Sequence, residues 1–341
     1  MLGANPAHTS QTTDQTRNLP QAIWRMRLDA AIYASPVAGE RSVFVVAHDQ
    51  QVRALDANTG REQWTFAVGG AISATPLLVG EVVVVAAKDG RVTALDRRNG
   101  KRRWEISTGG PVVSSPIADD GVIYFGSKNL NLYAVRATDG VILWKYFAAD
   151  YKYGGLYASP GLDRQYVYVG AKNGVLHAVS RQTGQHVWQA ILGSSIYGPP
   201  LVAAGRLYVG AYDRGLYAID AGTGGVIWRA QLDDWPQGGA VLIEPLVYVA
   251  ARSGTLYALL ASDGSVVWSR NLGGELRHGP VVSGNGIGII GVYPGRVLGI
   301  DMDDGRIAWQ IAVAGPAFAQ PILANQTLFV ATVDGEVSAW R

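Results

Sequence analysis

The sequence predicts an all-β fold, an eight-bladed β-propeller of four-stranded antiparallel blades. Three observations lead to it: tryptophan recurs at a nearly constant spacing, the residues between tryptophans repeat one pattern of strands and turns, and the two chain ends complement each other. The intervals between tryptophans are 40, 40, 40, 44, 40, 40 and 41 residues, and a period near 40 is typical of one propeller blade. The eight are Trp24, Trp64, Trp104, Trp144, Trp188, Trp228, Trp268 and Trp309.

Short runs rich in Val and Tyr open each repeat and predict β-strands. Dipeptides such as Asp89-Gly90 and Asn173-Gly174 follow these runs and predict two-residue hairpin turns. No part of the chain sustains a helical period, so four short strands per repeat are expected, and radial repetition protects their edges. The clearest runs are at 43–47, 82–87, 122–126, 166–170, 207–210 and 247–250.

Two small residues mark the second half of each repeat. A glycine lies four residues before each tryptophan from Trp64 onward, after turn-forming residues, and we expect it to take a positive φ. An alanine lies ten residues before each tryptophan from Trp64 to Trp268, and Gly299 takes its place before Trp309.

The chain ends predict how the ring closes. The last repeat stops at Ala339-Trp340-Arg341 without an outer strand, whereas residues 21–28 around Trp24 form an outer-strand sequence without the rest of a blade. We therefore expect residues 21–28 to complete the last blade. Trp340 is then an inner-strand residue, and residues 21–341 form a single propeller domain.

Composition excludes several classes of function. A net charge of +2 is too small to indicate nucleic-acid binding. Residues 1–20 are rich in Ser, Thr, Gln and Asn, which predicts a flexible tail or linker. The sequence shows neither a secretory leader nor an apolar span, so direct insertion into a membrane is not expected of this chain.

The run Ala-x-Asp-x-x-x-Gly-x-x-x-Trp resembles the tryptophan-docking motif of the pyrroloquinoline-quinone-type propellers, and the resemblance covers about residues 21–341. It implies that each indole packs between the motif alanine and the turn glycine of a neighbouring blade. Propeller lipoproteins of the bacterial outer-membrane β-barrel assembly machinery and sensor propellers are similar. Intact copies are Ala54/Asp56/Gly60/Trp64, Ala94/Asp96/Gly100/Trp104 and Ala218/Asp220/Gly224/Trp228.

The resemblance also includes quinoprotein alcohol dehydrogenases, which hold their cofactor with a disulfide and a calcium site and use an aspartate as base. This chain has no cysteine, and acidic residues such as Asp56 and Asp301 are typical turn residues. We find no carboxylate cluster for calcium and no metal-ligand spacing among the histidines. We therefore expect no catalytic residue, no metal and no cofactor, with pyrroloquinoline quinone as the disfavoured possibility.

Positions at which the repeats differ predict a binding site on one face. The turn between the second and third strands of a blade shares a face with the link to the next blade, so both sets of residues can converge there. The turn residues are His48, Lys88, Lys128, Lys172, Tyr212, Arg252, Tyr293 and Val333. The link residues are Tyr33, Ser73, Val113, Tyr157, Tyr197, Gln237, Arg277 and Phe318. Together they predict an aromatic and cationic funnel around the mouth of the central channel.

Two loops add to this face. Four extra residues after Trp144 bring Tyr151 and Tyr153 to it, and the segment 233–239 carries Trp235, which lies outside the tryptophan repeat. Inserted loops on a repeat scaffold are common binding sites. Either loop could instead pack into the channel mouth.

The funnel suits a small anionic or aromatic ligand, or an acidic or aromatic-bearing peptide. Its lysines and tyrosines are equally typical of exposed hairpin turns and strand ends. The favoured function is a non-catalytic protein-interaction or sensor scaffold with a protein or peptide partner. The alternatives are a sensor that binds a small molecule or quinone and, less favoured, a minimal quinoprotein oxidoreductase. An extracytoplasmic location, periplasmic or at the cell surface, is expected, with any leader or anchor outside this chain.

Overall fold

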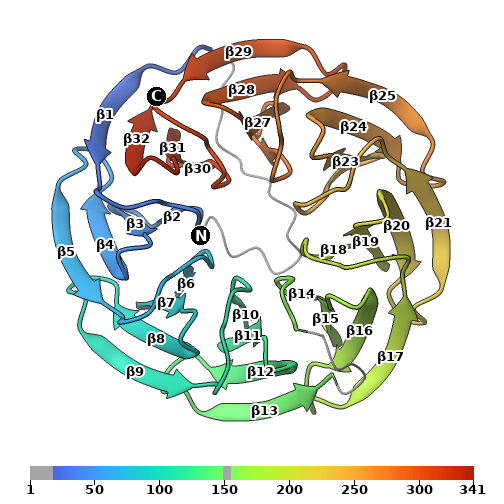
Figure 1. Ribbon diagram of the computed structural model, residues 1–341, viewed down its shortest axis with the longest axis horizontal. Coiled ribbons are helices and arrows are strands. Elements are labelled where there is room, and N and C mark those ends of the chain that lie inside the picture. The colour runs from blue at the N-terminus through green and yellow to red at the C-terminus, as the bar shows by residue number, and fades with distance from the viewer. Residues whose placement is uncertain (1–17, 149–154) are drawn as a thin grey trace.

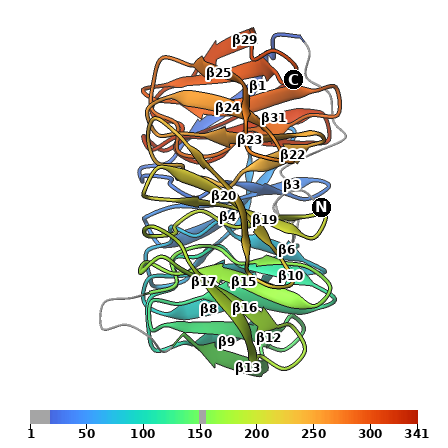
Figure 2. The ribbon, with the colours of Figure 1, turned by 90° about the vertical axis from the view of Figure 1, so that its right-hand side faces the viewer.

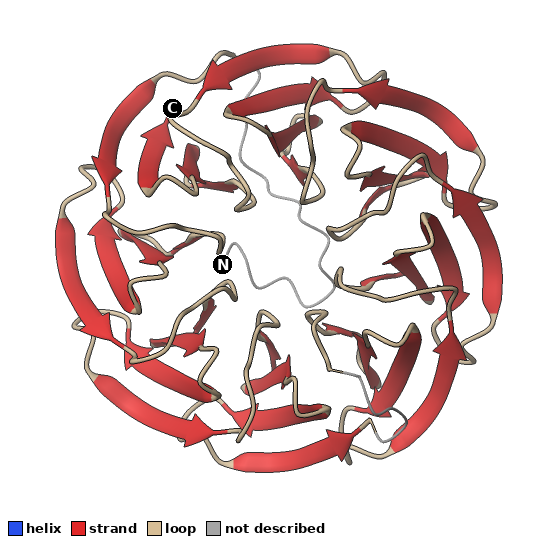
Figure 3. Cartoon of the chain, viewed as in Figure 1, coloured by secondary structure: helices blue, strands red, loops and turns tan. Residues whose placement is uncertain are grey.

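Eight four-stranded antiparallel sheets surround a common axis in the computed structural model, which describes residues 18–148 and 155–341 (Figure 1). The described residues contain strands, turns and loops and no helix (Figure 3). Each sheet is one blade whose four strands follow one another from the axis outward to the rim (Figure 1), and the disc is wider than it is thick (Figure 2). The predicted eight-bladed propeller is confirmed.

Blades are numbered here in chain order. Blade 1 consists of β2 (Val37–Ala38), β3 (Ser42–Val46), β4 (Gln51–Asp56) and β5 (Glu62–Ala67), and blade 2 of β6 (Leu77–Val79), β7 (Val82–Ala86), β8 (Arg91–Asp96) and β9 (Arg102–Ser107). Blade 3 consists of β10 (Ile117–Asp119), β11 (Val122–Gly126), β12 (Asn131–Arg136) and β13 (Ile142–Phe147), and blade 4 of β14 (Gly161–Leu162), β15 (Tyr166–Gly170), β16 (Val175–Ser180) and β17 (His186–Ile191). Blade 5 consists of β18 (Leu201–Ala203), β19 (Arg206–Ala211), β20 (Gly215–Asp220) and β21 (Val226–Gln231), and blade 6 of β22 (Val241–Ile243), β23 (Leu246–Ala250), β24 (Thr255–Leu260) and β25 (Val266–Asn271). Blade 7 consists of β26 (Val281–Val282), β27 (Ile287–Val292), β28 (Arg296–Asp301) and β29 (Ile307–Ala312), and blade 8 of β30 (Ile322–Ala324), β31 (Thr327–Ala331), β32 (Glu336–Trp340) and β1 (Ala22–Arg27).

The N-terminal strand closes the ring. β1 pairs antiparallel with β32, with Trp24 opposite Ala339, so the first and last strands of the chain lie side by side (Figure 1). Gln21 and Arg341 continue the pairing with two backbone hydrogen bonds of 2.7 and 2.9 Å. Trp340 lies opposite Leu328 of β31, on the inner side of the blade. The closure predicted from the chain ends is confirmed.

The core of the propeller lies between blades rather than within one. Apolar strands such as β7, buried along its whole length, pack face to face with the strands of the adjacent blade. Outer strands are exposed at most positions, but each carries one indole turned inward. Apolar area removed from water between neighbouring sheets therefore holds the ring together.

Seven of the eight repeat indoles contact the turn glycine of the next blade. A Cβ atom on Gly264, for example, would lie 2.5 Å from the ring of Trp228, so the indole occupies the space of a missing side chain. The glycines of this position, from Gly60 to Gly305, have φ between +70° and +76°, as expected. Six indoles also donate their Nε1–H to a backbone carbonyl of the next blade: Trp24, Trp64, Trp104, Trp144, Trp188 and Trp228.

Blade 6 varies this contact. The Met302 carbonyl, which stands where other blades present the acceptor, accepts a 2.8 Å hydrogen bond from the Tyr248 hydroxyl. The buried Trp268 Nε1 has no hydrogen-bond partner among the described residues. Packing against Gly305 therefore holds this indole without its hydrogen bond.

The turns between second and third strands differ from the sequence prediction. The Ala87 N–H donates to the Arg91 carbonyl and the Gly90 N–H donates to the Ala87 carbonyl, so Lys88, Asp89 and Gly90 form a three-residue loop. Gly90, with φ +89°, occupies the last loop position. The predicted two-residue turn is wrong, because a three-residue loop that ends in a left-handed residue places the glycine just before the next strand.

Candidate functional site

A cavity of about 420 Å³ is lined by residues that precede the innermost strands of all eight blades. It lies on the face of the links and of the turns between second and third strands. Of the described residues that line it, Arg277 is the sole Lys or Arg and none is Asp or Glu. The structure brings together all eight predicted link residues, namely Tyr33, Ser73, Val113, Tyr157, Tyr197, Gln237, Arg277 and Phe318.

Hydroxyl side chains line the half of the cavity formed by blades 1 to 4. Three of them accept a hydrogen bond from the backbone N–H of the preceding blade's hydroxyl residue: the Ser35 N–H donates to Thr75 at 3.2 Å, the Thr75 N–H to Ser115 at 3.0 Å, and the Ser115 N–H to Ser159 at 2.8 Å. We call Ser35, Thr75, Ser115 and Ser159 the hydroxyl belt. All four line the cavity, so the belt both ties adjacent blades together and presents polar groups to the channel mouth. Sequence reasoning missed it.

The belt ends where blade 5 begins. The corresponding positions of blades 5 to 8 are Pro199, Gly239, Gly279 and Gln320, of which the first three have no side-chain donor. Gln320 spans the gap between its own blade and blade 7 by donating its Nε2–H to the Gly279 carbonyl at 3.0 Å. The two halves of the mouth are therefore built differently.

A row of aromatic side chains runs from the link into blade 4 to the link into blade 6, and its first two members, Tyr157 and Tyr197, line the cavity. Tyr157 contacts Tyr197 edge-on at 5.4 Å between ring centroids, Tyr197 contacts Tyr212 at 4.6 Å, and Tyr212 stacks on Trp235 at 4.7 Å with 3° between the planes. We call these four residues the aromatic arc. Burial raises the pKa of the Tyr212 hydroxyl, so this phenol stays neutral.

A cation lies over each end of the aromatic arc. The Lys128 ammonium is 4.6 Å from the Tyr157 ring centre, and the Arg252 guanidinium is 5.2 Å from that of Trp235. These are distances at which a ring face attracts a cation. Lys128, a turn residue of blade 3, thus contacts the link into blade 4, and Arg252, a turn residue of blade 6, contacts the link into its own blade.

Two arginines share one carboxylate beside the cavity. Glu275 Oε1 accepts hydrogen bonds from Arg252 Nε at 2.9 Å and from Arg277 Nε at 2.8 Å. The Arg277 guanidinium also lies 3.7 Å over the ring of Phe318, which stacks on Tyr293. Two positive charges and one negative charge leave this group with one positive charge in excess. Sequence reasoning missed Glu275, although it stands two residues before Arg277.

His278 is the large exception at a position of small residues. The other blades have Ala, Ser or Gly there: Ala34, Ala74, Ser114, Ala158, Gly198, Gly238 and Ala319. Its imidazole lines the cavity, and burial, with a smaller contribution from Arg277, lowers its pKa to about 4. The ring is therefore neutral at neutral pH. The sequence held a signal for it, the departure from a small residue.

Tyr33 and Ser73, which line the cavity, contact the turn residue His48 of blade 1. Tyr33 packs on His48 at 4.6 Å, and Ser73 Oγ is 3.1 Å from His48 Nε2. Burial and the nearby Lys88 lower the pKa of His48. Lys88 and Lys172 occupy their turns but are absent from the described cavity lining. Tyr151 and Tyr153 lie outside the described residues.

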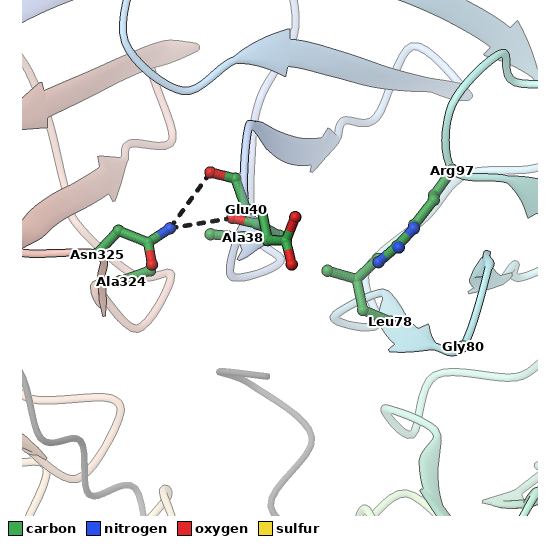
Figure 4. Close-up of a pocket in the computed structure, with 8 residues that line it drawn as sticks. Ala38, Glu40, Leu78, Gly80, Arg97, Ala324 and Asn325 are labelled. Carbon is green, nitrogen blue, oxygen red and sulfur yellow. Dashed lines mark hydrogen bonds between the residues drawn. The ribbon is translucent and has the colours of Figure 1, made fainter.

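The opposite face has a smaller cavity of about 200 Å³, at the turns between first and second strands (Figure 4). Asn325 donates from Nδ2 to the Gly39 and Glu40 carbonyls at 3.3 and 3.4 Å, which links blades 8 and 1. Arg97, which also lines it, pairs with Glu81 at 2.9 Å. Its polar groups thus hold turns in place.

The described residues contain neither a group of side chains suited to a metal ion nor a membrane-spanning helix. Across 18–148 and 155–341, no three His, Asp or Glu side chains gather closely enough to hold a metal ion. The same part of the chain contains no helix able to cross a membrane.

Comparison with known proteins relates the whole propeller to a family. A family model described as outer membrane protein assembly factor BamB matches residues 20–155, 148–243, 216–287 and 252–340. The structure of BamB from Moraxella catarrhalis is similar with a TM-score of 0.79 and 19% identity, covering 95% of this chain and 98% of that one. No curated protein matches the chain.

Two other solved structures share the fold. Quinohemoprotein alcohol dehydrogenase from Comamonas testosteroni has a TM-score of 0.83 and 15% identity, covering 99% of this chain and 80% of that one. The computationally designed Ika8 protein has a TM-score of 0.82 and 16% identity, covering 94% of this chain and 99% of that one. At such identities the likeness concerns architecture, which proteins of different function share.

Proposed function

This chain belongs to the family described as outer membrane protein assembly factor BamB, and from that premise we propose that it is a non-catalytic scaffold that binds a protein partner at the channel mouth. The observation that carries the proposal is the convergence of the eight link residues on one cavity. They hold equivalent places in the ring yet include Tyr, Ser, Val, Gln, Arg and Phe. Such diversity on a uniform scaffold is typical of a recognition surface.

The chemistry of the mouth supports binding over catalysis. Of the described lining residues none is a carboxylate, and the neutral His278 is the sole candidate base there. Pyrroloquinoline quinone with a calcium ion does not fit this lining, because calcium requires several oxygen ligands that include carboxylates. Aromatic and arginine side chains are instead enriched in protein interfaces.

The family's description also bears on location. An assembly factor for outer membrane proteins acts outside the cytoplasm, and we extend that location, periplasmic or at the cell surface, to this chain.

A second candidate is a sensor that binds a small anionic or aromatic molecule. The cavity volume of about 420 Å³ favours it, since it falls in the range of small-molecule sites. Such a ligand would occupy the same lining without a protein partner.

Site-specific photocrosslinking in the source cells tests the scaffold proposal. A benzophenone amino acid replaces Gln237, at the mouth, or Gln185, exposed in a turn on the opposite face. We expect a discrete protein adduct from position 237 and none from position 185. Equal adducts at both positions, or no adduct at position 237, would exclude the mouth as the partner site. A small molecule that remains with the purified protein and is lost on mutating the mouth would favour the second candidate.

A further inference from the structure

We propose, resting on the proposed function, that the partner segment at the mouth is an acidic peptide that carries an aromatic side chain. Its carboxylate binds Arg277, and its ring packs on the aromatic arc at Tyr157 and Tyr197. The charges of the lining, the contacts of Arg277 and the asymmetry of the cavity lead to this assignment.

The charge of the cavity selects an anion. Arg277 is the only Lys or Arg and no Asp or Glu is present among its described lining residues. His278 adds no charge at neutral pH. A carboxylate that enters the cavity therefore meets the Arg277 guanidinium, with Glu275 beside the cavity as the nearest like charge. A hydrogen bond between ionised partners is about twice as strong as a neutral one.

Arg277 has capacity for a further acceptor. Its hydrogen bond to Glu275 uses Nε, and 30% of its side chain is exposed. A guanidinium carries five N–H donors. Phe318 lies under the guanidinium plane and fixes its orientation, so the group is already positioned before a ligand arrives.

Glu275 competes with a ligand carboxylate for the positive charge of Arg277. It accepts hydrogen bonds from both Arg252 and Arg277. One carboxylate cannot neutralise two guanidiniums, and a ligand carboxylate would restore the balance. Removal of Glu275 would therefore strengthen binding of an acidic peptide, whereas a purely structural role predicts the opposite.

Different parts of the cavity lining suit the aromatic side chain and the backbone of the peptide. Tyr157 and Tyr197 line the cavity near blades 4 and 5 and offer ring surface to an aromatic side chain. The hydroxyl belt and Gln237 line other parts of the same cavity and suit the backbone amides of the peptide. A cavity of about 420 Å³ admits a short segment of a partner rather than a folded element.

Fluorescence anisotropy with two labelled peptides tests the assignment. The acidic probe is Gly-Phe-Asp-Gly-Phe-Asp-Gly with an amidated C-terminus, and its matched partner has Asn in place of both Asp. We expect the full chain to bind the acidic probe at least about tenfold more tightly at low salt, with a smaller ratio at high salt.

Three variants locate the effect. Arg277→Gln should reduce the preference for the acidic probe to less than about twofold, and Glu275→Gln should tighten its binding several-fold. Arg164→Gln removes an exposed arginine on the opposite face and should leave both affinities unchanged. Thermal melts monitored by circular dichroism confirm that each variant is folded.

Several outcomes would overturn the inference. These are equal or undetectable binding of the two probes, a preference that survives Arg277→Gln, and weaker acidic-probe binding in a folded Glu275→Gln protein. If a crosslinked partner at position 237 is found alongside any of them, the scaffold proposal stands and the acidic-peptide assignment falls.

Discussion

The tryptophans of the outer strands and the link residues of the channel mouth form two concentric sets with the same spacing in the chain. At the rim the same residue recurs in every blade and seven of the indoles contact the turn glycine of the next blade. At the mouth, nine residues after most of those tryptophans, the side chain changes from blade to blade. Because a uniform contact at the rim holds the blades together, the side chains at the mouth can differ from blade to blade without loss of the fold.

Replacement of one tryptophan at the rim and of Trp235, in the aromatic arc beside the mouth, should show the largest difference in stability. Trp228→Ala removes a buried indole, its 3.1 Å hydrogen bond to the Ala261 carbonyl and its contact with Gly264. We expect a loss of about 3 to 5 kcal/mol in the free energy of unfolding. Trp235→Ala, in the half-buried aromatic arc, should cost less than half as much. Chemical denaturation measures both, and equal losses would contradict the division between rim and mouth.

Alanine substitutions at two glycines with the same backbone conformation distinguish the cost of a steric clash from the cost of backbone strain. Gly264 and Gly109 have φ of +76° and +74°, but an added Cβ meets Trp228 at the first and nothing within 4 Å at the second. Gly109→Ala should cost about 1 to 2 kcal/mol from the left-handed conformation alone. Gly264→Ala should cost about 2 kcal/mol more, because the indole must also move. Similar losses in denaturation experiments would show that the indole does not depend on the glycine.

His278 gives the mouth a pH dependence of its own. Its pKa is about 4 in the folded chain and 6.5 in a model peptide. Between those values the unfolded chain binds a proton that the folded chain does not, so stability falls as the pH is lowered through this window and is constant above it.

His278→Ala, which installs the residue of blades 1, 2, 4 and 8, should remove this component. From pH 7 to pH 4 we expect the natural protein to lose about 2 kcal/mol more than the variant, a value reduced for the imidazole's contact with the cavity. His186→Ala, on the exposed face of an outer strand, is the control. Parallel pH profiles for the natural protein and His278→Ala would refute the expectation.

The hydroxyl belt should give the smallest effect. Thr75→Val keeps the shape of the side chain but removes the acceptor for the Ser35 N–H. We expect a loss of about 1 kcal/mol, the usual net value of one hydrogen bond. Thr65→Val, on an exposed outer strand, should change stability by less than about 0.5 kcal/mol. A loss above about 3 kcal/mol for Thr75→Val would place the belt among the main joints of the ring.

The rim could be predicted from the chain because its copies agree. The recurrence of Trp and Gly established the blade period, and the incomplete first and last repeats established the pairing of Trp24 with Ala339. The loop at Lys88 to Gly90 could not be predicted to the residue. Its length depends on which backbone groups close it, here Ala87 and Arg91, and that choice depends on how the sheet twists.

The mouth could be predicted in position but not in its contacts. Spacing brought the eight link residues to one cavity, yet it could not show that Arg252 and Arg277 meet at Glu275. That meeting depends on the rotation of blade 7 against blade 6. The serines of the belt have the same spacing as the tryptophans, but Ser is also an ordinary turn residue, so the pattern alone did not identify them.

Under mechanical force, the pairing of β1 with β32 should break one hydrogen-bonded pair at a time rather than all at once. The ends of the two strands, Gln21 and Arg341, lie side by side and exchange backbone hydrogen bonds. Those bonds run across the strands, so a pull that separates the two chain ends loads them one pair at a time. In the other blades, neighbouring strands are joined covalently by hairpin turns, so the same pull cannot separate them by breaking hydrogen bonds alone. Tension on the termini therefore concentrates at a single seam, and the ring opens there first.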